Sequence, residues 1–119
     1  MAKILLAEDD ESMRTFLANA LARAGHLVDA VGDGLSAESA VRRDEYEILI
    51  ADIVMPGIDG IELARRASSV QPKLRVMFIT GFAAVALKAR EEAPRDARVL
   101  SKPFHLREIV AEIDRMLAA

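Results

Sequence analysis

Short apolar runs that end in polar residues constrain the fold of this chain most strongly. The four clearest runs have the length of β-strands and are mainly aliphatic, at positions 4–7, 48–51, 76–79 and 99–101. A weaker run lies near residues 27–31. The stretches KILLA and EILIA are apolar almost throughout, as strands covered by helices on both faces are. We therefore expect these two strands at the centre of a parallel sheet.

Stretches with helical periodicity separate the strand-like runs. Between Met13 and Ala24, apolar residues recur with the i, i+3, i+4, i+7 spacing of a buried helical stripe, and Gly25 is a typical helix end. Residues 106–117 repeat this spacing. Three weaker helices are predicted, at about residues 34–43, 61–70 and 83–92. The strict alternation of five strands and five helices predicts an α/β fold: a doubly wound, flavodoxin-like parallel sheet with strand order 2-1-3-4-5.

Composition argues against several classes of protein. The chain has 119 residues, the size of one domain, and 52% of them are hydrophobic, which is enough for a packed core. The absence of cysteine excludes disulfide bonds and thiolate zinc sites. We expect neither a leader peptide nor a membrane span, because the apolar stretches are far shorter than the roughly 20 residues a span needs. The 16 basic and 19 acidic residues argue against nucleic-acid binding. A cytoplasmic location is the simplest expectation.

Polar side chains follow four of the strand-like runs. Glu8 and Asp9 follow the first, and Asp52, Thr80 and Lys102 follow three others. Because parallel strands end at the same edge of a sheet, where chemistry in open α/β folds is located, we expect these side chains on one rim. Carboxylates this close repel one another unless a cation lies among them. Mg²⁺ prefers oxygen ligands, so we predict a Mg²⁺ site with Asp9 and Asp52 as direct ligands and Glu8 bound through water.

The same rim suits phosphoryl transfer onto an aspartate. Asp52 is the predicted nucleophile, since carboxylates form aspartyl-phosphates. Lys102 would neutralise charge on the phosphoryl oxygens, and the Thr80 hydroxyl would donate a hydrogen bond to one of them. A cis bond before Pro103 would aim Lys102 over the rim. Asp10, in contrast, is the better candidate for the N-cap of the first helix.

The motifs as a set resemble a known family. The stretches ILLAEDD, ADIVMPGIDGIELA, VMFITG and VLSKPF, in this order, resemble the receiver domain of bacterial two-component response regulators. The resemblance covers essentially the whole chain, so it implies a receiver domain over residues 1–119 with no effector domain. It also implies that Asp52 accepts a phosphoryl group from a phosphohistidine on a sensor kinase or phosphotransferase, and that the chain is not a conventional enzyme.

The resemblance extends to the ligands and the partners. It implies Mg²⁺ held by Asp9, Asp52 and the backbone carbonyl of Val54, with Thr80 and Lys102 contacting the phosphate. More narrowly, the segments TGFAAVAL and LSKPFHL look like the CpdR group of single-domain regulators, which is associated with control of proteolysis by the ClpXP protease. This implies the ClpX unfoldase or its substrates as partners. The alternative is a phosphorelay intermediate or kinase-regulating receiver without a protease role.

The chain departs from the receiver pattern at Val99. Many receivers have an aromatic residue three positions before the active-site lysine, and its rotamer couples phosphorylation to the output face. A stiff β-branched side chain without a hydroxyl cannot act in this way. Movement of the loop after Thr80, involving Phe82, is the predicted substitute, although ordinary packing explains Phe82 equally well.

Three other functions fit the sequence less well. A phosphatase of the haloacid dehalogenase type needs a second aspartate two residues after a nucleophile that follows the first strand, and Glu8-Asp9-Asp10 lacks that spacing. A nucleotide-binding domain would have a glycine-rich loop after the first strand. A binding module that has lost phosphorylation would not retain the complete set of rim residues.

Overall fold

A computed structural model describes residues 2–81, 91, 97–102 and 104–118 of the chain. Its five parallel strands are β1 (Lys3–Ala7), β2 (Leu27–Val31), β3 (Ile48–Asp52), β4 (Arg75–Thr80) and β5 (Arg98–Ser101). The described helices are α1 (Glu11–Arg23), α2 (Gly34–Arg43), α3 (Gly60–Val70) and α5 (Leu106–Ala118). The strand order β2-β1-β3-β4-β5 confirms the predicted flavodoxin-like sheet. Of the helix expected over residues 83–92, the structure describes Glu91 alone.

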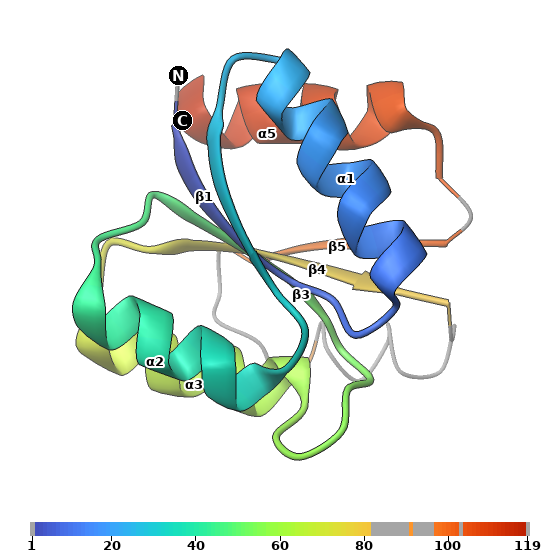
Figure 1. The fold of residues 1–119 in the computed structure, drawn as a ribbon. Coiled ribbons are helices and arrows are strands. Elements are labelled where there is room, and N and C mark those ends of the chain that lie inside the picture. The colour runs from blue at the N-terminus through green and yellow to red at the C-terminus, as the bar shows by residue number, and fades with distance from the viewer. Residues whose placement is uncertain (1, 82–90, 92–96, 103, 119) are drawn as a thin grey trace.

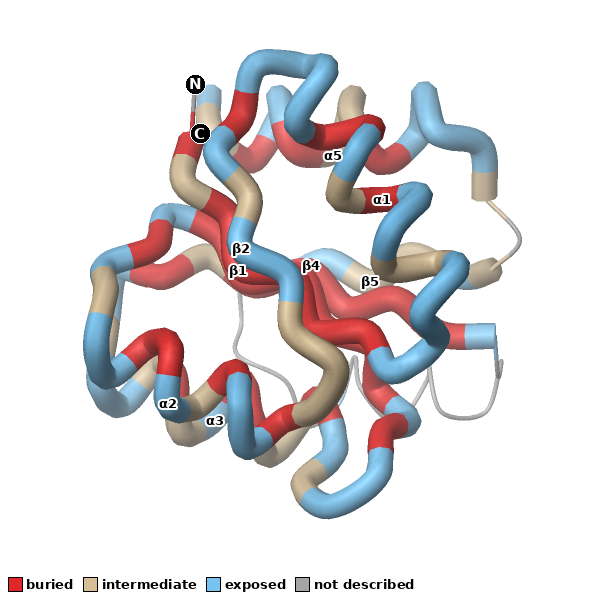
Figure 2. Tube along the Cα trace, in the orientation of Figure 1, coloured by how far each residue is buried: buried red, intermediate tan, exposed pale blue. Residues whose placement is uncertain are grey.

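Helices cover both faces of the sheet. Figure 1 shows α1 and α5 on one face and α2 and α3 on the other. The central strands β1 and β3 pair in register from Ile4 with Ile48 to Ala7 with Ala51. Figure 2 shows buried residues along the middle of the sheet and on the inner sides of the helices. The near-continuous apolar runs are therefore explained, as predicted, by a strand with a helix layer on each side.

The alternation of side chains along each strand divides the core into two clusters. Leu5 and Phe78 belong to the cluster on the side of α2 and α3. Leu6, Ile50 and Leu17 belong to the cluster on the side of α1 and α5. Within the part of the chain that the structure describes, no helix is long and apolar enough to cross a membrane.

Aspartate caps fix the starts of three helices. The side chains of Asp10, Asp33 and Asp59 each accept a hydrogen bond from a backbone N–H in the first turn of α1, α2 and α3 respectively. The predicted cap role of Asp10 is thereby confirmed, with 3.1 Å between Met13 N and Asp10 Oδ1. At the other end of α1, Gly25 has a φ of 97°, which a glycine adopts without steric cost.

Gly60 allows α3 to begin directly against the end of β3. A Cβ at this position would lie 2.4 Å from the carbonyl oxygen of Asp52 and 2.9 Å from Cα of Ile53, so only glycine fits. The Gly60 N–H donates to the Ile53 carbonyl oxygen at 2.8 Å. This close approach fixes the loop that follows Asp52.

Candidate functional site

The carboxyl edge of the sheet collects the polar residues that the sequence places there. Asp52 and Thr80 are the last residues of β3 and β4, and Lys102 directly follows β5. Glu8 and Asp9 directly follow β1. The parallel pairing of all five strands explains why positions so distant in sequence share one rim.

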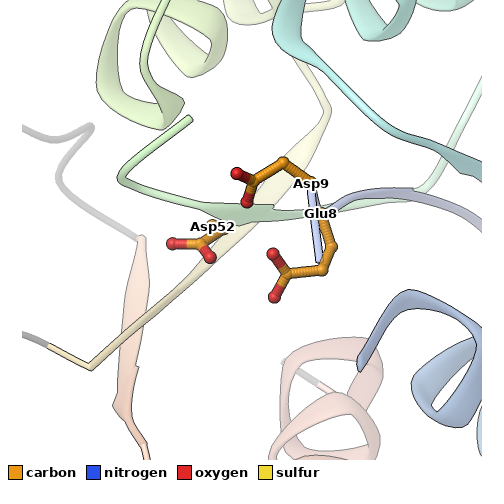
Figure 3. Close-up of side chains that lie close together, drawn as sticks. All are labelled: Glu8, Asp9 and Asp52. Atoms are coloured by element: carbon orange, nitrogen blue, oxygen red, sulfur yellow. The ribbon is translucent and has the colours of Figure 1, made fainter. Parts of the chain in front are cut away.

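Three carboxylates form the centre of the site. One oxygen each of Glu8, Asp9 and Asp52 lies within 4.8 Å of the other two. Figure 3 shows the three side chains close together. Glu8 and Asp52 are buried, whereas Asp9 is exposed. A set of hard oxygen donors that is open on one side suits Mg²⁺, which retains several water ligands.

Lys102 pairs with two of these carboxylates. Its Nζ lies 3.0 Å from Glu8 Oε1 and 3.1 Å from Asp52 Oδ2. Partial burial lowers the pKa of Lys102, but the hydrogen bonds to Glu8 and Asp52 outweigh this effect and the net shift is upward. The ammonium group therefore stays protonated and offsets part of the negative charge at the rim.

The Glu8 side chain is costly to ionise in this position. Its pKa is raised from 4.5 to about 7, mainly because the carboxyl group is buried, and the neighbouring Asp52 carboxylate adds to the shift. Lys102 and the backbone N–H of Asp10 act in the opposite direction but do not cancel it. The protein groups around Glu8 thus do not fully offset the cost of burying its charge.

Three of the remaining predicted residues, Val54, Thr80 and Val99, are described by the structure. The Val54 N–H donates to Asp52 Oδ1 at 3.2 Å, and the Val54 side chain is 47% exposed beside the rim. Thr80 is fully buried, and its carbonyl oxygen accepts a hydrogen bond from Lys102 N at 2.6 Å. Val99 is partly buried in β5 against the cluster that contains Phe78. The predictions for Phe82 and Pro103 lie outside the described residues.

Sequence reasoning did not identify Arg14 as part of this region. Its Nη1 donates to the backbone carbonyl oxygen of Glu8 at 2.9 Å. A cation near the N-terminus of a helix is electrostatically unfavourable, so an arginine at this position in α1 is a signal that could have been noticed.

A family model described as the response regulator receiver domain matches residues 4–114. The chain belongs to the response regulator receiver family. It is 57% identical over 119 residues to the response regulator receiver protein CpdR of Brucella abortus, and the match covers all of this chain and 99% of that protein. The predicted resemblance to receivers, and to the CpdR group within them, is confirmed.

Some relatives in the receiver family are much longer than this chain, and others have about its length. The DNA-binding transcriptional regulator NtrC of Azospirillum brasilense is 36% identical over 118 residues, which are 98% of this chain but 24% of that protein.

Among solved structures, a response regulator receiver protein from Sinorhizobium medicae superposes with a TM-score of 0.92 at 28% identity, covering 98% of this chain and 94% of that one. TrrA of Thermotoga maritima, in complex with Mg²⁺-BeF, shares the fold with a TM-score of 0.87 at 24% identity, covering 98% and 99% of the two chains.

Proposed function

We propose that this receiver accepts a phosphoryl group on Asp52 from the phosphohistidine of a sensor kinase or histidine phosphotransferase, in a Mg²⁺-dependent reaction. The observation that carries the proposal is the position of Asp52. It ends a central strand, shares the rim with Glu8 and Asp9, and has the Lys102 ammonium 3.1 Å from its Oδ2. A carboxylate in this position is both a nucleophile and a metal ligand.

The donor set fits a magnesium ion. Asp9, Asp52 and the backbone carbonyl of Val54 would bind it directly, and Glu8 would bind it through water. The closeness of the three carboxylates supports this assignment, because a divalent cation would neutralise charge that Lys102 alone does not. When bound, Mg²⁺ would supply positive charge against the oxygens of the transferring phosphoryl group.

The chain's own residues would perform the transfer by position and charge. A carboxylate oxygen of Asp52 forms a bond to phosphorus, the phosphorus–nitrogen bond of the phosphohistidine breaks, and its electron pair returns to the imidazole ring. The Lys102 ammonium and the Thr80 hydroxyl contact the phosphoryl oxygens as their charge develops. The product remains attached to Asp52, so the chain is a phosphoacceptor rather than a conventional enzyme.

Labelling by a small donor tests this proposal without a kinase. Wild type treated with acetyl phosphate or phosphoramidate should be labelled in Mg²⁺ and not after chelation. Asp52→Ala should abolish labelling, whereas Asp59→Asn should retain it, because the exposed Asp59 side chain accepts a hydrogen bond from Glu62 N in the first turn of α3 and contacts none of the rim residues in the interactions described above. Undiminished labelling of the Asp52 variant would disprove the assignment.

We propose further that phosphorylation switches protein–protein contacts, and that the output is control of ClpXP-dependent proteolysis. Support comes from the full-length match to CpdR. The surface of the receiver domain itself would contact the partner. The face of β5 and α5 is the best candidate, because Thr80 and Lys102 border it; the helix expected over residues 83–92 would belong to the same face and lies outside the described residues. A partner can sense phosphorylation only if its affinity differs between the two states.

A binding experiment decides between this output and a phosphorelay role. We expect the unphosphorylated form to bind ClpX or a ClpX substrate in the cytoplasm, and phosphorylation to release it. Pull-downs with wild type and Asp52→Ala, each with and without the small donor, measure this. Donor-dependent release of wild type but not of Asp52→Ala supports the switch. Equal binding in all four samples would disprove it, and capture of a histidine phosphotransferase alone would favour the phosphorelay alternative.

A further inference from the structure

Arg14 connects three parts of the rim. It lies near the start of α1, and its Nη1 donates to the carbonyl oxygen of Glu8, at the end of β1, at 2.9 Å. The turn after β2 approaches the same guanidinium group, since a Cβ added to Gly32 would lie 3.0 Å from Nη1. The side chain is only partly exposed, which limits its freedom to leave this contact.

The backbone on both sides of Asp9 is held by hydrogen bonds. The Glu8 N–H donates to the Val31 carbonyl oxygen at 3.1 Å, and the Asp10 N–H donates to Glu8 Oε2 at 3.2 Å. The Asp10 carbonyl oxygen accepts from Arg14 N at 2.8 Å. The carbonyl of the Glu8–Asp9 peptide is bound by the Arg14 guanidinium. Arg14 thus acts on this segment through both its backbone and its side chain.

Asp9 depends on this backbone more than the other two carboxylates do. Lys102 binds Glu8 and Asp52, but the Asp9 carboxylate makes no hydrogen bond or ion pair with any residue that the structure describes. An aspartate side chain has few rotamers, so the direction of its carboxylate follows the orientation of its own peptide. The orientation of the Glu8–Asp9 peptide therefore limits the directions in which Asp9 presents its oxygen atoms.

We propose that Arg14 is a positioning residue for the metal site: it fixes the Glu8–Asp9 peptide and so aims Asp9 at Mg²⁺. This inference rests on the proposed function, because it assigns Asp9 as a ligand. Residues that orient metal ligands from outside the coordination shell commonly change metal affinity by ten- to a hundredfold. Arg14 would do so through a peptide rather than through a ligand side chain.

Mg²⁺ titration of metal-free protein by calorimetry tests the inference. We expect Arg14→Gln to raise the Kd for Mg²⁺ about tenfold, and Arg14→Lys, which keeps a donor, to recover most of the affinity. The matched control is Arg23→Gln, an exposed arginine on the same helix. Labelling by acetyl phosphate should need correspondingly more Mg²⁺ and reach a similar plateau rate. A Kd for Arg14→Gln within about twofold of the control would overturn the inference.

Gly32 offers an independent perturbation of the same group. The Cβ of an alanine at position 32 would press on the Arg14 guanidinium. The φ of Gly32 is not positive, so the backbone itself would accept alanine. Gly32→Ala should therefore weaken Mg²⁺ binding when residue 14 is arginine. The same change should have no effect in the Arg14→Gln background, and equal effects in both backgrounds would contradict the mechanism. If wild type binds Mg²⁺ but accepts no phosphoryl group, the proposed function is wrong. The Kd values for Mg²⁺ of wild type and of the variants still decide the role of Arg14 in that case. Failure of wild type to bind Mg²⁺ would overturn both.

Discussion

At the scale of single residues, the buried Glu8 carboxyl group lowers the free energy of unfolding when it is ionised. Burial raises the pKa of Glu8 to about 7, while in the unfolded chain the group titrates near 4.5. The folded state therefore holds this proton more tightly. Between these two values, rising pH removes stability, and above about pH 7 the full cost of the buried charge is present.

Replacing this carboxyl group should stabilise the metal-free protein. At pH 8, Glu8→Gln should raise the free energy of unfolding by on the order of 2 kcal/mol, because the amide is not ionised. At pH 4.5 the gain should be much smaller. Urea unfolding at the two pH values measures this, with Glu45→Gln, an exposed residue, as control. Destabilisation at pH 8, or an equal effect at both pH values, would contradict the account.

The side chain of Val54 should lengthen the life of the phosphorylated state. Hydrolysis of an aspartyl-phosphate needs a water molecule aligned behind the phosphorus atom, and an exposed apolar side chain beside the rim offers that water no partner. We therefore predict slow self-dephosphorylation and a severalfold faster loss in Val54→Asn. Decay of label after removal of the donor measures both, and Val70→Asn, at the end of α3, is the matched control. A wild-type lifetime of seconds, or no change in the variant, would disprove this idea.

At the scale of elements, Gln71 joins α2 and α3 at the amino edge of the sheet. Its Nε2 donates to the carbonyl oxygens of Val41 and Asp44, both at 2.7 Å, and its Oε1 accepts from Tyr46 N at 3.0 Å. It also serves as the C-cap residue of α3. One side chain thus satisfies backbone groups that the end of α2 leaves without partners.

Gln71 should therefore matter for stability and not for the metal site. Gln71→Leu should lower the free energy of unfolding by roughly 2 kcal/mol, since partly buried polar groups lose their partners. The Kd for Mg²⁺ should stay within about twofold of wild type, because the rim lies at the opposite edge of the sheet. Urea unfolding and calorimetry check the two parts, with Ser69→Ala, an exposed change nearby, as control. A large change in Mg²⁺ affinity would contradict this separation.

Elements with strong periodicity were predictable from the sequence. The helical stripe over residues 106–117 matches α5 at Leu106–Ala118, because local apolar spacing determines which face is buried. The site followed from the elements, since Asp52 ends one parallel strand and Lys102 directly follows another. The bonds of Arg14 to Glu8 and of Gln71 to Val41 were not predictable, because they depend on rotamers and on backbone positions set by tertiary packing.

At the scale of the whole molecule, the two edges of the sheet have different tasks. The carboxyl edge holds charged groups close together at a cost in stability, and Arg14 and Lys102 restrain them. The amino edge contributes bonds such as those of Gln71, which stabilise the fold. Two apolar clusters, one on each face of the sheet, lie between the edges and include the buried side chains of β1 and β3. This division lets the rim keep its buried carboxylates while the domain stays folded.

The central claim is that the phosphoryl group is attached to Asp52, and reductive trapping tests it most directly. Protein phosphorylated by a histidine phosphotransferase in Mg²⁺ is treated with borohydride, which converts an aspartyl-phosphate to homoserine, and its peptides are mapped by mass spectrometry. The account predicts homoserine at position 52 alone, and none when Mg²⁺ is chelated before transfer. Homoserine at another aspartate, or an unmodified Asp52 in protein that carries label, would contradict it.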